Sequence, residues 1–282
     1  MRLIPTRHLW GVAQPSSEAL PRLAADGFAA VEPVAQWLTE AGIAEMRQLA
    51  AVHHLDLLPL VYTSGRTVAE HLAEFRRVLA LAMTFAPIRI NVHSGLDAWS
   101  RDEAMAFYRE ARAIAADLPV AVCHETHRGR TFYSPWITRD ILLAVPGLRL
   151  TADFSHWVCV AERRILDEDP DLLAFVADQV SHIHARVGHS QGPQVPDPRA
   201  PEWQEDVLAH EGWWDVVWQR MAARGEEFCT MTPEFGPAPY LAQRPYTNMP
   251  MIDLWQICTW QMQRQMARFQ TPTGSWHSTR LA

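Results

Sequence analysis

Residues 148–186 have the sequence LRLTADFSHWVCVAERRILDEDPDLLAFVADQVSHIHAR. Within it, the apolar run Leu148–Asp153 predicts a buried strand, the segment Asp169–Asp178 predicts a helix, and Val180–Arg186 predicts a second strand. The order strand, helix, strand is typical of a parallel sheet covered by helices.

The same alternation continues along the whole chain. The predicted strands are His8–Ala13, Ala29–Pro33, Asp56–Val61, Ile88–His93, Val120–Glu125, Leu148–Asp153, Val180–Arg186 and Phe228–Glu234. The predicted helices are Ser16–Asp26, Leu38–His53, Val68–Thr84, Arg101–Ala116, Thr138–Ala144, Asp169–Asp178, Trp213–Arg224 and Met251–Phe269. This pattern predicts a single α/β (β/α)8 TIM barrel. The alternative is an open doubly wound sheet, but residues 10–14 (WGVAQ) lack its glycine-rich first turn.

The chain contains no long linker and no low-complexity segment that would divide it. Its 282 residues are close to the length of one barrel, which takes about 250 residues. We therefore expect one TIM-barrel catalytic domain over residues 1–270 and a polar C-terminal tail over residues 271–282. The long segment Val187–Glu211 is expected to form a lid or binding loop.

The basic residues restrict the chemistry. All 25 are arginine, so a Schiff-base lysine, a P-loop lysine and a lysine that anchors pyridoxal phosphate are excluded. The GxGxxG, GxSxG and HExxH motifs are also absent from the sequence. A net charge of −7 does not favour nucleic acid as a partner.

The compartment and assembly are inferred from composition. The sequence has no apolar run of 18 residues, so we expect no membrane span. Its four cysteines have no CxxC spacing and are interpreted as reduced thiols of a cytoplasmic protein. A homo-oligomer stays open, with the Trp- and Met-rich final helix as the candidate contact surface.

Acidic and imidazole side chains occur at the ends of the last four predicted strands. They are Glu125, Asp153, His184 and Glu234. Catalytic groups of a barrel lie at the carboxyl ends of its strands, and neighbouring strands are about 4.8 Å apart, so these side chains can converge on one ion. A set of three carboxylates and one imidazole favours Mn²⁺, Mg²⁺ or Co²⁺. His182 has the same strand parity as His184 and remains an alternative ligand.

Each of these residues also has an ordinary structural explanation. A carboxylate at a strand end commonly caps a helix or forms an ion pair, and Asp153 is placed to cap the helix that follows it. His182 is equally well explained as a core histidine. Four such residues on four consecutive strands favour a metal or carboxylate site.

Four short motifs resemble the xylose-isomerase-like TIM-barrel superfamily, which includes sugar isomerases, epimerases, inosose-type dehydratases and the endonuclease IV branch. The motifs are HETHRG at residues 124–129, ADFSH at 152–156, HIHAR at 182–186 and PEFG at 233–236. By this resemblance the four strand-end residues are the ligands of one divalent metal ion (Mn, Mg, Co or Zn). His156 matches a histidine that contacts substrate oxygens, and Arg186 lies near a substrate-binding arginine.

The resemblance implies a divalent-metal-dependent sugar or polyol isomerase or epimerase of carbohydrate metabolism. A proton is removed next to a carbonyl that the metal holds, with Glu125 and Glu234 as the acid–base pair and His156 beside them. We also expect His93, His127 and Trp157 to contact a small carbohydrate or polyol substrate.

Three other functions remain as alternatives. A metal-dependent dehydratase or lyase acting on a sugar or cyclitol would use the same proton abstraction. An endonuclease IV-like phosphodiesterase is disfavoured, because that branch has an Asp-x-His after strand seven where this chain has Asp197-Pro198-Arg199. The last alternative is a non-catalytic sugar-binding barrel.

Overall fold

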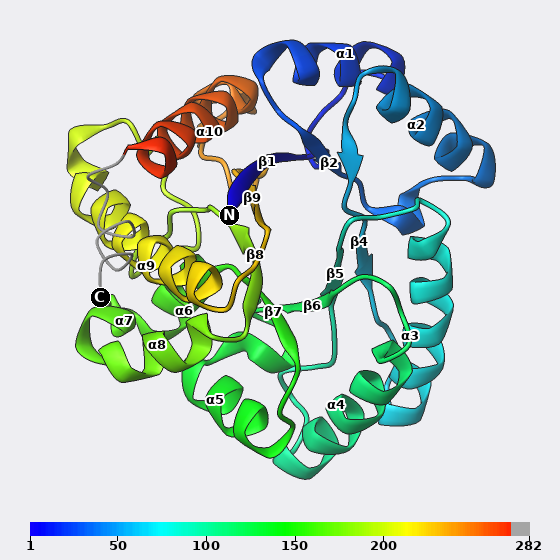
Figure 1. Ribbon diagram of the computed structural model, residues 1–282. Helices are drawn as coiled ribbons and strands as arrows, with labels where there is room; N and C mark the ends of the chain where they lie inside the picture. The colour runs from blue at the N-terminus through cyan, green and yellow to red at the C-terminus, as the bar shows by residue number, and fades with distance from the viewer. Residues whose placement is uncertain (272–282) are drawn as a thin grey trace.

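The computed structural model describes residues 1–271 and contains a central parallel barrel surrounded by helices (Figure 1). The barrel strands are β1 (Arg2–His8), β2 (Ala30–Glu32), β3 (Asp56–Leu57), β4 (Leu60–Tyr62), β5 (Ile90–His93), β6 (Val122–Glu125), β7 (Arg149–Ala152), β8 (Val180–His184) and β9 (Phe228–Thr232). The predicted α/β TIM barrel is therefore confirmed.

The barrel closes at its third strand, which is broken into two short pieces. The sheet order is β3-β2-β1-β9-β8-β7-β6-β5-β4, so β3 pairs with β2 while β4 pairs with β5. An isolated parallel bridge between Val34 and Leu60 joins the two edges. Proline at position 59, between the two pieces, has no N–H to donate to a ladder, which is consistent with the break.

The helices form a ring outside the strands (Figure 1). They are α1 (Ser16–Asp26), α2 (Glu40–Val52), α3 (Val68–Met83), α4 (Arg101–Ala115), α5 (Pro135–Ala144), α6 (Phe154–Ala161), α7 (Ile165–Glu168), α8 (Pro170–Ala177), α9 (Gln204–Ala223) and α10 (Leu254–Gln270). Capping boxes fix the starts of two of them: Thr67 with Glu70 at α3, and Ser100 with Glu103 at α4.

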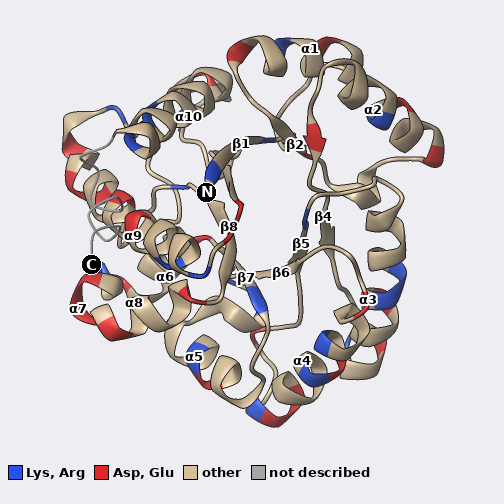
Figure 2. Ribbon diagram, in the orientation of Figure 1, with Lys and Arg blue, Asp and Glu red and all other residues tan. Residues whose placement is uncertain are grey.

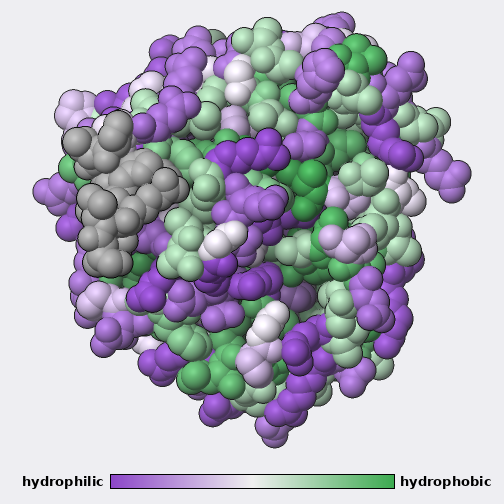
Figure 3. Space-filling view, viewed as in Figure 1, coloured by the Kyte–Doolittle hydropathy of each residue, from purple (hydrophilic) through white to green (hydrophobic). Residues whose placement is uncertain are grey.

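The outer face of the ring is polar and carries both charges. Acidic and basic side chains occur on most of the helices (Figure 2), and hydrophilic residues cover much of the perimeter in Figure 3. A small antiparallel hairpin, β10 (Gln243–Arg244) with β11 (Met249–Pro250), lies between β9 and α10. Within residues 1–271, no helix is long and apolar enough to span a membrane. All four cysteines are free thiols.

The first strand was wrongly predicted. The sequence pattern indicated His8–Ala13, whereas β1 is Arg2–His8 and ends where the prediction begins. The apolar pattern missed β1 because the strand contains the polar residues Thr6 and Arg7. Both are buried, one on each face of a strand that is enclosed by strands and helices.

The prediction for the long segment after the seventh predicted strand, Val180–Arg186, was also partly wrong. The expected lid Val187–Glu211 is shorter, because α9 begins at Gln204, and the predicted helix Trp213–Arg224 is only its second half. The two short helices α6 and α7 were not predicted as separate elements. Residues 272–282 of the predicted tail lie outside the described residues.

Candidate metal centre

The four predicted ligands lie together at the carboxyl ends of neighbouring strands. Glu125 and His184 are the last residues of β6 and β8, Asp153 follows β7, and Glu234 comes two residues after β9. One ligand atom from each lies within 4.8 Å of the other three, and all four side chains are buried. The parallel order β6-β7-β8-β9 is what brings residues so distant in sequence to one place.

Asp153 has two roles, one for each oxygen. Its Oδ1 caps α6 by accepting a hydrogen bond from the Ser155 backbone N–H at 3.1 Å, so the capping explanation of this residue is correct. Its Oδ2 faces the centre. The cap also places His156 on the first turn of α6, where its Nε2 lies 3.6 Å from Asp153 Oδ2.

Arg186 lies between two of the predicted ligands. Its Nε donates to Asp153 Oδ2 at 3.0 Å, and its Nη2 lies 2.5 Å from Glu234 Oε2. Burial disfavours the charged guanidinium, but the two carboxylates outweigh this effect and hold the pKa of Arg186 above its ordinary value. Arg186 is thus a permanent cation within the centre.

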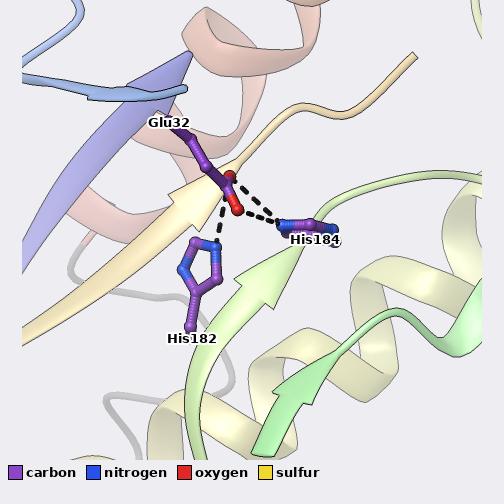
Figure 4. A group of neighbouring side chains, drawn as sticks. All are labelled: Glu32, His182 and His184. Atoms are coloured by element: carbon purple, nitrogen blue, oxygen red, sulfur yellow. Dashed lines mark hydrogen bonds and ion pairs between the residues drawn. The ribbon is translucent and has the colours of Figure 1, made fainter. Parts of the chain in front are cut away.

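His184 lies among three carboxylates. Its Nδ1 is 2.7 Å from Glu234 Oε2 and 3.5 Å from Glu125 Oε2, and its Nε2 is 2.9 Å from Glu32 Oε1 (Figure 4). Burial lowers the pKa of His184, but the three carboxylates outweigh burial and raise it well above its ordinary value. A carboxylate bound to one imidazole nitrogen fixes the ring and leaves the other nitrogen directed at the centre.

Glu32, at the end of β2, was not predicted as a site residue. It accepts hydrogen bonds from Thr232 Oγ1 at 2.7 Å and from Asn91 Nδ2 at 3.0 Å, and His182 Nε2 lies 3.5 Å away (Figure 4). Asn91 also donates to Glu125 Oε2 at 2.7 Å. The polar Asn91 inside the apolar strand Ile88–His93 was the sequence signal that could have indicated this network.

Three histidine rings line one side of the centre. His93 Nε2 lies 2.7 Å from Glu125 Oε2, and the ring of His127 lies 4.5 Å from that of His93 and 4.0 Å from that of His156. Burial is the main cause that lowers the pKa of His127, to about 3, and the pKa of His156. Among the described residues, neither ring nitrogen of His156 has a hydrogen-bond partner, so this neutral ring is free to contact a ligand.

Two aromatic residues cover Arg186, and a different aromatic residue, Trp157, was predicted to contact the substrate. The guanidinium carbon of Arg186 lies 4.8 Å from the ring of Tyr240 and 5.8 Å from that of Trp10. Trp157, which was expected to stack on substrate, is fully buried in the hydrophobic core, where its Nε1 donates to the Phe132 carbonyl at 2.9 Å. Its ring and its N–H are thus both engaged inside the protein, and we leave Trp157 out of the proposed site.

The charges of the centre fit a divalent cation. Four buried carboxylates surround one guanidinium and one imidazole, which leaves an excess of negative charge. Burial, reinforced by Glu234 and Glu125, raises the pKa of Asp153 to about 7, despite the opposing effect of Arg186. Glu125 Oε1 is buried without a hydrogen-bond partner among residues 1–271. An added cation would compensate both features, and it would share Asp153 and Glu234 with Arg186.

Comparison with known proteins gives matches in structure but not in sequence. No protein-family model and no curated protein matches the chain. Among solved structures, D-psicose 3-epimerase from Clostridium cellulolyticum H10, determined with D-tagatose, is 14% identical at a TM-score of 0.61 and covers 95% of this chain and 97% of its own. At this identity the likeness shows the shared TIM-barrel fold.

Two further solved structures have the same fold; one is described as a dehydratase and the other as a complex with magnesium. A probable 3-DHS dehydratase from Bacillus anthracis is 14% identical at a TM-score of 0.59, covering 94% of this chain and 98% of that one. A xylose isomerase-like TIM-barrel protein from Mycobacterium smegmatis, in complex with magnesium, is 14% identical at a TM-score of 0.59. The match covers 90% of this chain and 89% of that one. At these identities the likeness establishes the fold, which confirms the predicted resemblance at that level.

Proposed function

We propose that this protein is a divalent-metal-dependent isomerase or epimerase of a sugar or polyol. The observation that carries the proposal is the convergence of Glu125, Asp153, His184 and Glu234 within 4.8 Å. Epimerases of sugars among the structures of this fold support the same class of reaction. Manganese, magnesium, cobalt and zinc are the candidate ions, held by these four side chains.

The acid–base pair is Glu125 and Glu234. They project from strands separated by β7 and β8, so they can reach opposite faces of a bound substrate. Burial opposes ionisation, but His93 and His184 lower the pKa of Glu125, and Arg186 and His184 lower that of Glu234. Both carboxylates are therefore ionised at neutral pH, the state in which one of them can remove a proton.

The remaining residues bind and orient the substrate in this proposal. A bound divalent ion supplies Lewis-acid stabilisation of the negative charge that develops when a proton leaves the carbon next to a carbonyl. One glutamate removes that proton and later releases it to water, while the other takes a proton from water and delivers it to the opposite face of the same carbon. His156, whose ring nitrogens have no hydrogen-bond partner among residues 1–271, contacts substrate oxygens, as do His93, His127 and Arg186.

Metal content is the first test. Protein purified without chelators or an affinity tag is expected to contain about one divalent ion per chain by mass spectrometry. Asp153→Ala should lose it, whereas Asp197→Ala, a change in a surface ion pair with Arg199, should retain it. If titration of metal-depleted protein gave no uptake of any of the four ions, the proposed centre would be wrong.

Solvent exchange tests the reaction. Incubation of the metal-loaded protein with ketoses such as D-tagatose and D-allulose in D₂O should introduce deuterium at the carbon next to the carbonyl. Glu125→Gln or Glu234→Gln should reduce exchange by about 10²–10⁴-fold, the usual contribution of a general base. Glu45→Gln, at an exposed position of α2, is the matched control and should leave it unchanged.

A dehydratase is the second candidate, supported by the dehydratase among the structures of this fold. It would use the same proton removal but expel a hydroxyl group from the neighbouring carbon. A product lighter by one water molecule would identify it, whereas an epimer keeps the mass of its substrate.

A further inference from the structure

A cavity lies beside the candidate metal centre and has no part in the proposed reaction. Its volume is about 710 Å³, within the range of small-molecule sites. The loop after β1, the loop after β9 and the first turn of α10 form its walls, at the place where α1 and α10 meet in the ring (Figure 1).

Arg7 lies at the bottom of this cavity. Its side chain is only 2% exposed, and one of its Nη atoms donates to the His8 carbonyl. Within residues 1–271 no carboxylate forms an ion pair with it. A buried guanidinium normally has an anionic partner, because the desolvation of a charge is costly. The lining of the cavity therefore includes a buried guanidinium that no ion pair compensates among residues 1–271.

A second arginine lines the same cavity. The guanidinium carbon of Arg22, on α1, lies 3.8 Å from the centroid of the Trp255 ring, and that of Arg7 lies 5.9 Å from it. One carboxylate, Asp253, also lines the cavity, but its Oδ1 caps α10 by accepting from Trp255 N at 2.7 Å. Asp26 accepts from Trp255 Nε1 at 2.5 Å. Neither acid forms an ion pair with Arg7 or Arg22 among the residues that the structure describes, and the two guanidinium groups outnumber the one carboxylate of the lining.

We propose that this cavity binds a small anion, a carboxylate or a phosphate group, between Arg7 and Arg22. Guanidinium groups match the oxygens of both anions with paired N–H donors. The glutamines at positions 14 and 243 line the same space and add neutral amide groups. Apart from Asp253, most of the remaining lining is apolar, which suits the carbon part of a small organic acid or of a sugar phosphate.

The cavity shares a wall with the metal centre. Trp10 covers Arg186 on one side, and the next residue, Gly11, lines the cavity on the other. Gly11 has φ of +82°, and a Cβ there would meet Pro237 Cδ at 3.0 Å, so the two loops pack closely. The anion is either the charged end of the substrate or a separate ligand. The binding itself rests on Arg7 and Arg22 alone and does not depend on the proposed isomerase reaction.

Calorimetric titration of metal-depleted protein with inorganic phosphate tests the site. We expect saturable binding that Arg22→Gln weakens at least fivefold and Arg7→Gln abolishes. Arg76→Gln, an exposed arginine of α3, is the matched control and should bind like the wild type. Arg22 is exposed, so its variant should fold even where Arg7→Gln does not. Absence of binding at 10 mM phosphate (about 10-fold above a millimolar Kd), or equal binding by Arg22→Gln and wild type, would overturn the proposal.

A second titration distinguishes the two sources of the anion. Glucose 6-phosphate and glucose are titrated into metal-depleted and Mn²⁺-loaded protein. If Mn²⁺ strengthens binding of the sugar phosphate but not of inorganic phosphate, the site receives the charged end of a substrate. If Mn²⁺ changes neither, the site holds a separate anion. Stronger binding of glucose than of its phosphate would contradict an anion site.

Discussion

Two adjacent regions of the barrel have opposite charge. The metal centre holds an excess of buried carboxylates around Arg186, whereas the outer cavity holds Arg7 and Arg22 without an ion pair among the described residues. In the first region most charges are compensated inside the protein. In the second, the two guanidinium groups outnumber the one carboxylate of the lining, Asp253, and an anionic ligand would balance the difference.

One strand contributes to both regions. His8 and Arg7 are neighbours on β1, and alternation directs them to opposite faces. The ring of His8 lies 6.4 Å from that of His184 in the metal centre, while Arg7 lines the outer cavity. Residues adjacent in sequence can therefore belong to sites of opposite charge, and this difference can be tested by removing charge from each region.

Removal of Arg186 should have the largest effect. In metal-depleted protein, Arg186→Met leaves Asp153 and Glu234 buried without their cation, and we expect the free energy of unfolding to fall by about 3–5 kcal/mol. Added Mn²⁺ should restore part of this loss because it replaces the missing positive charge. Chemical denaturation with and without the ion measures both effects.

The control for this experiment is a surface ion pair. Arg199 bonds Asp197 at 2.9 Å but is 35% exposed, so Arg199→Met should cost less than about 1 kcal/mol. Equal losses in the two variants would mean that Arg186 does not compensate the buried carboxylates.

The sequence predicted the barrel and the acidic centre because both depend on short local patterns. Each strand end carries its polar residue next to an apolar run, and parallel strands bring these ends together whatever the intervening loops do. For this reason Glu125, Asp153, His184 and Glu234 could be named before their geometry was known.

What the sequence did not predict depends on contacts between distant segments. Trp10 covers Arg186 only because Gly236, after β9, leaves space for its ring, and Arg7 looked like a loop residue because its burial is produced by helices packed on β1. The network of Glu32 and Asn91 likewise joins strands that are far apart in sequence. No local pattern encodes which of these segments will be neighbours.

The pH dependence of the two regions should differ. Metal binding requires the loss of a proton from Asp153, whose pKa is raised to about 7, and from His184, whose pKa is also raised. We expect Mn²⁺ affinity to increase about 50-fold from pH 6 to pH 7 and more gradually above that, where only His184 still competes. Sulfate binding by the arginine-lined cavity should stay constant, since arginine keeps its charge. Calorimetry at each pH measures both.

The variant Asp153→Asn sharpens this test, because it should bind Mn²⁺ more weakly and with about half the pH slope. The direction in which stability changes with pH also follows from the raised pKa of Asp153. The pKa of Asp153 lies above its unfolded value of 3.8, so this group makes the metal-depleted protein less stable as the pH rises from about 4 to about 7. If Mn²⁺ affinity depended on pH equally in Asp153→Asn and in the wild type, Asp153 would not be the titrating ligand.

The smallest effect should come from the wall between the regions. A Cβ at Gly236 would lie 2.0 Å from Trp10 Cζ3, and Gln194 holds both backbone groups of Gly236 at 2.8 and 3.2 Å, so the indole ring has to move. We expect Gly236→Ala to cost about 1–3 kcal/mol and to weaken both Mn²⁺ and phosphate binding. The control is Gly212→Ala, at an exposed position of α9 where no atom lies within 4 Å of an added Cβ. It should instead stabilise the protein by about 0.5–1 kcal/mol. Loss of Mn²⁺ binding alone would mean that Trp10 belongs to the metal centre and not to a wall that both regions share.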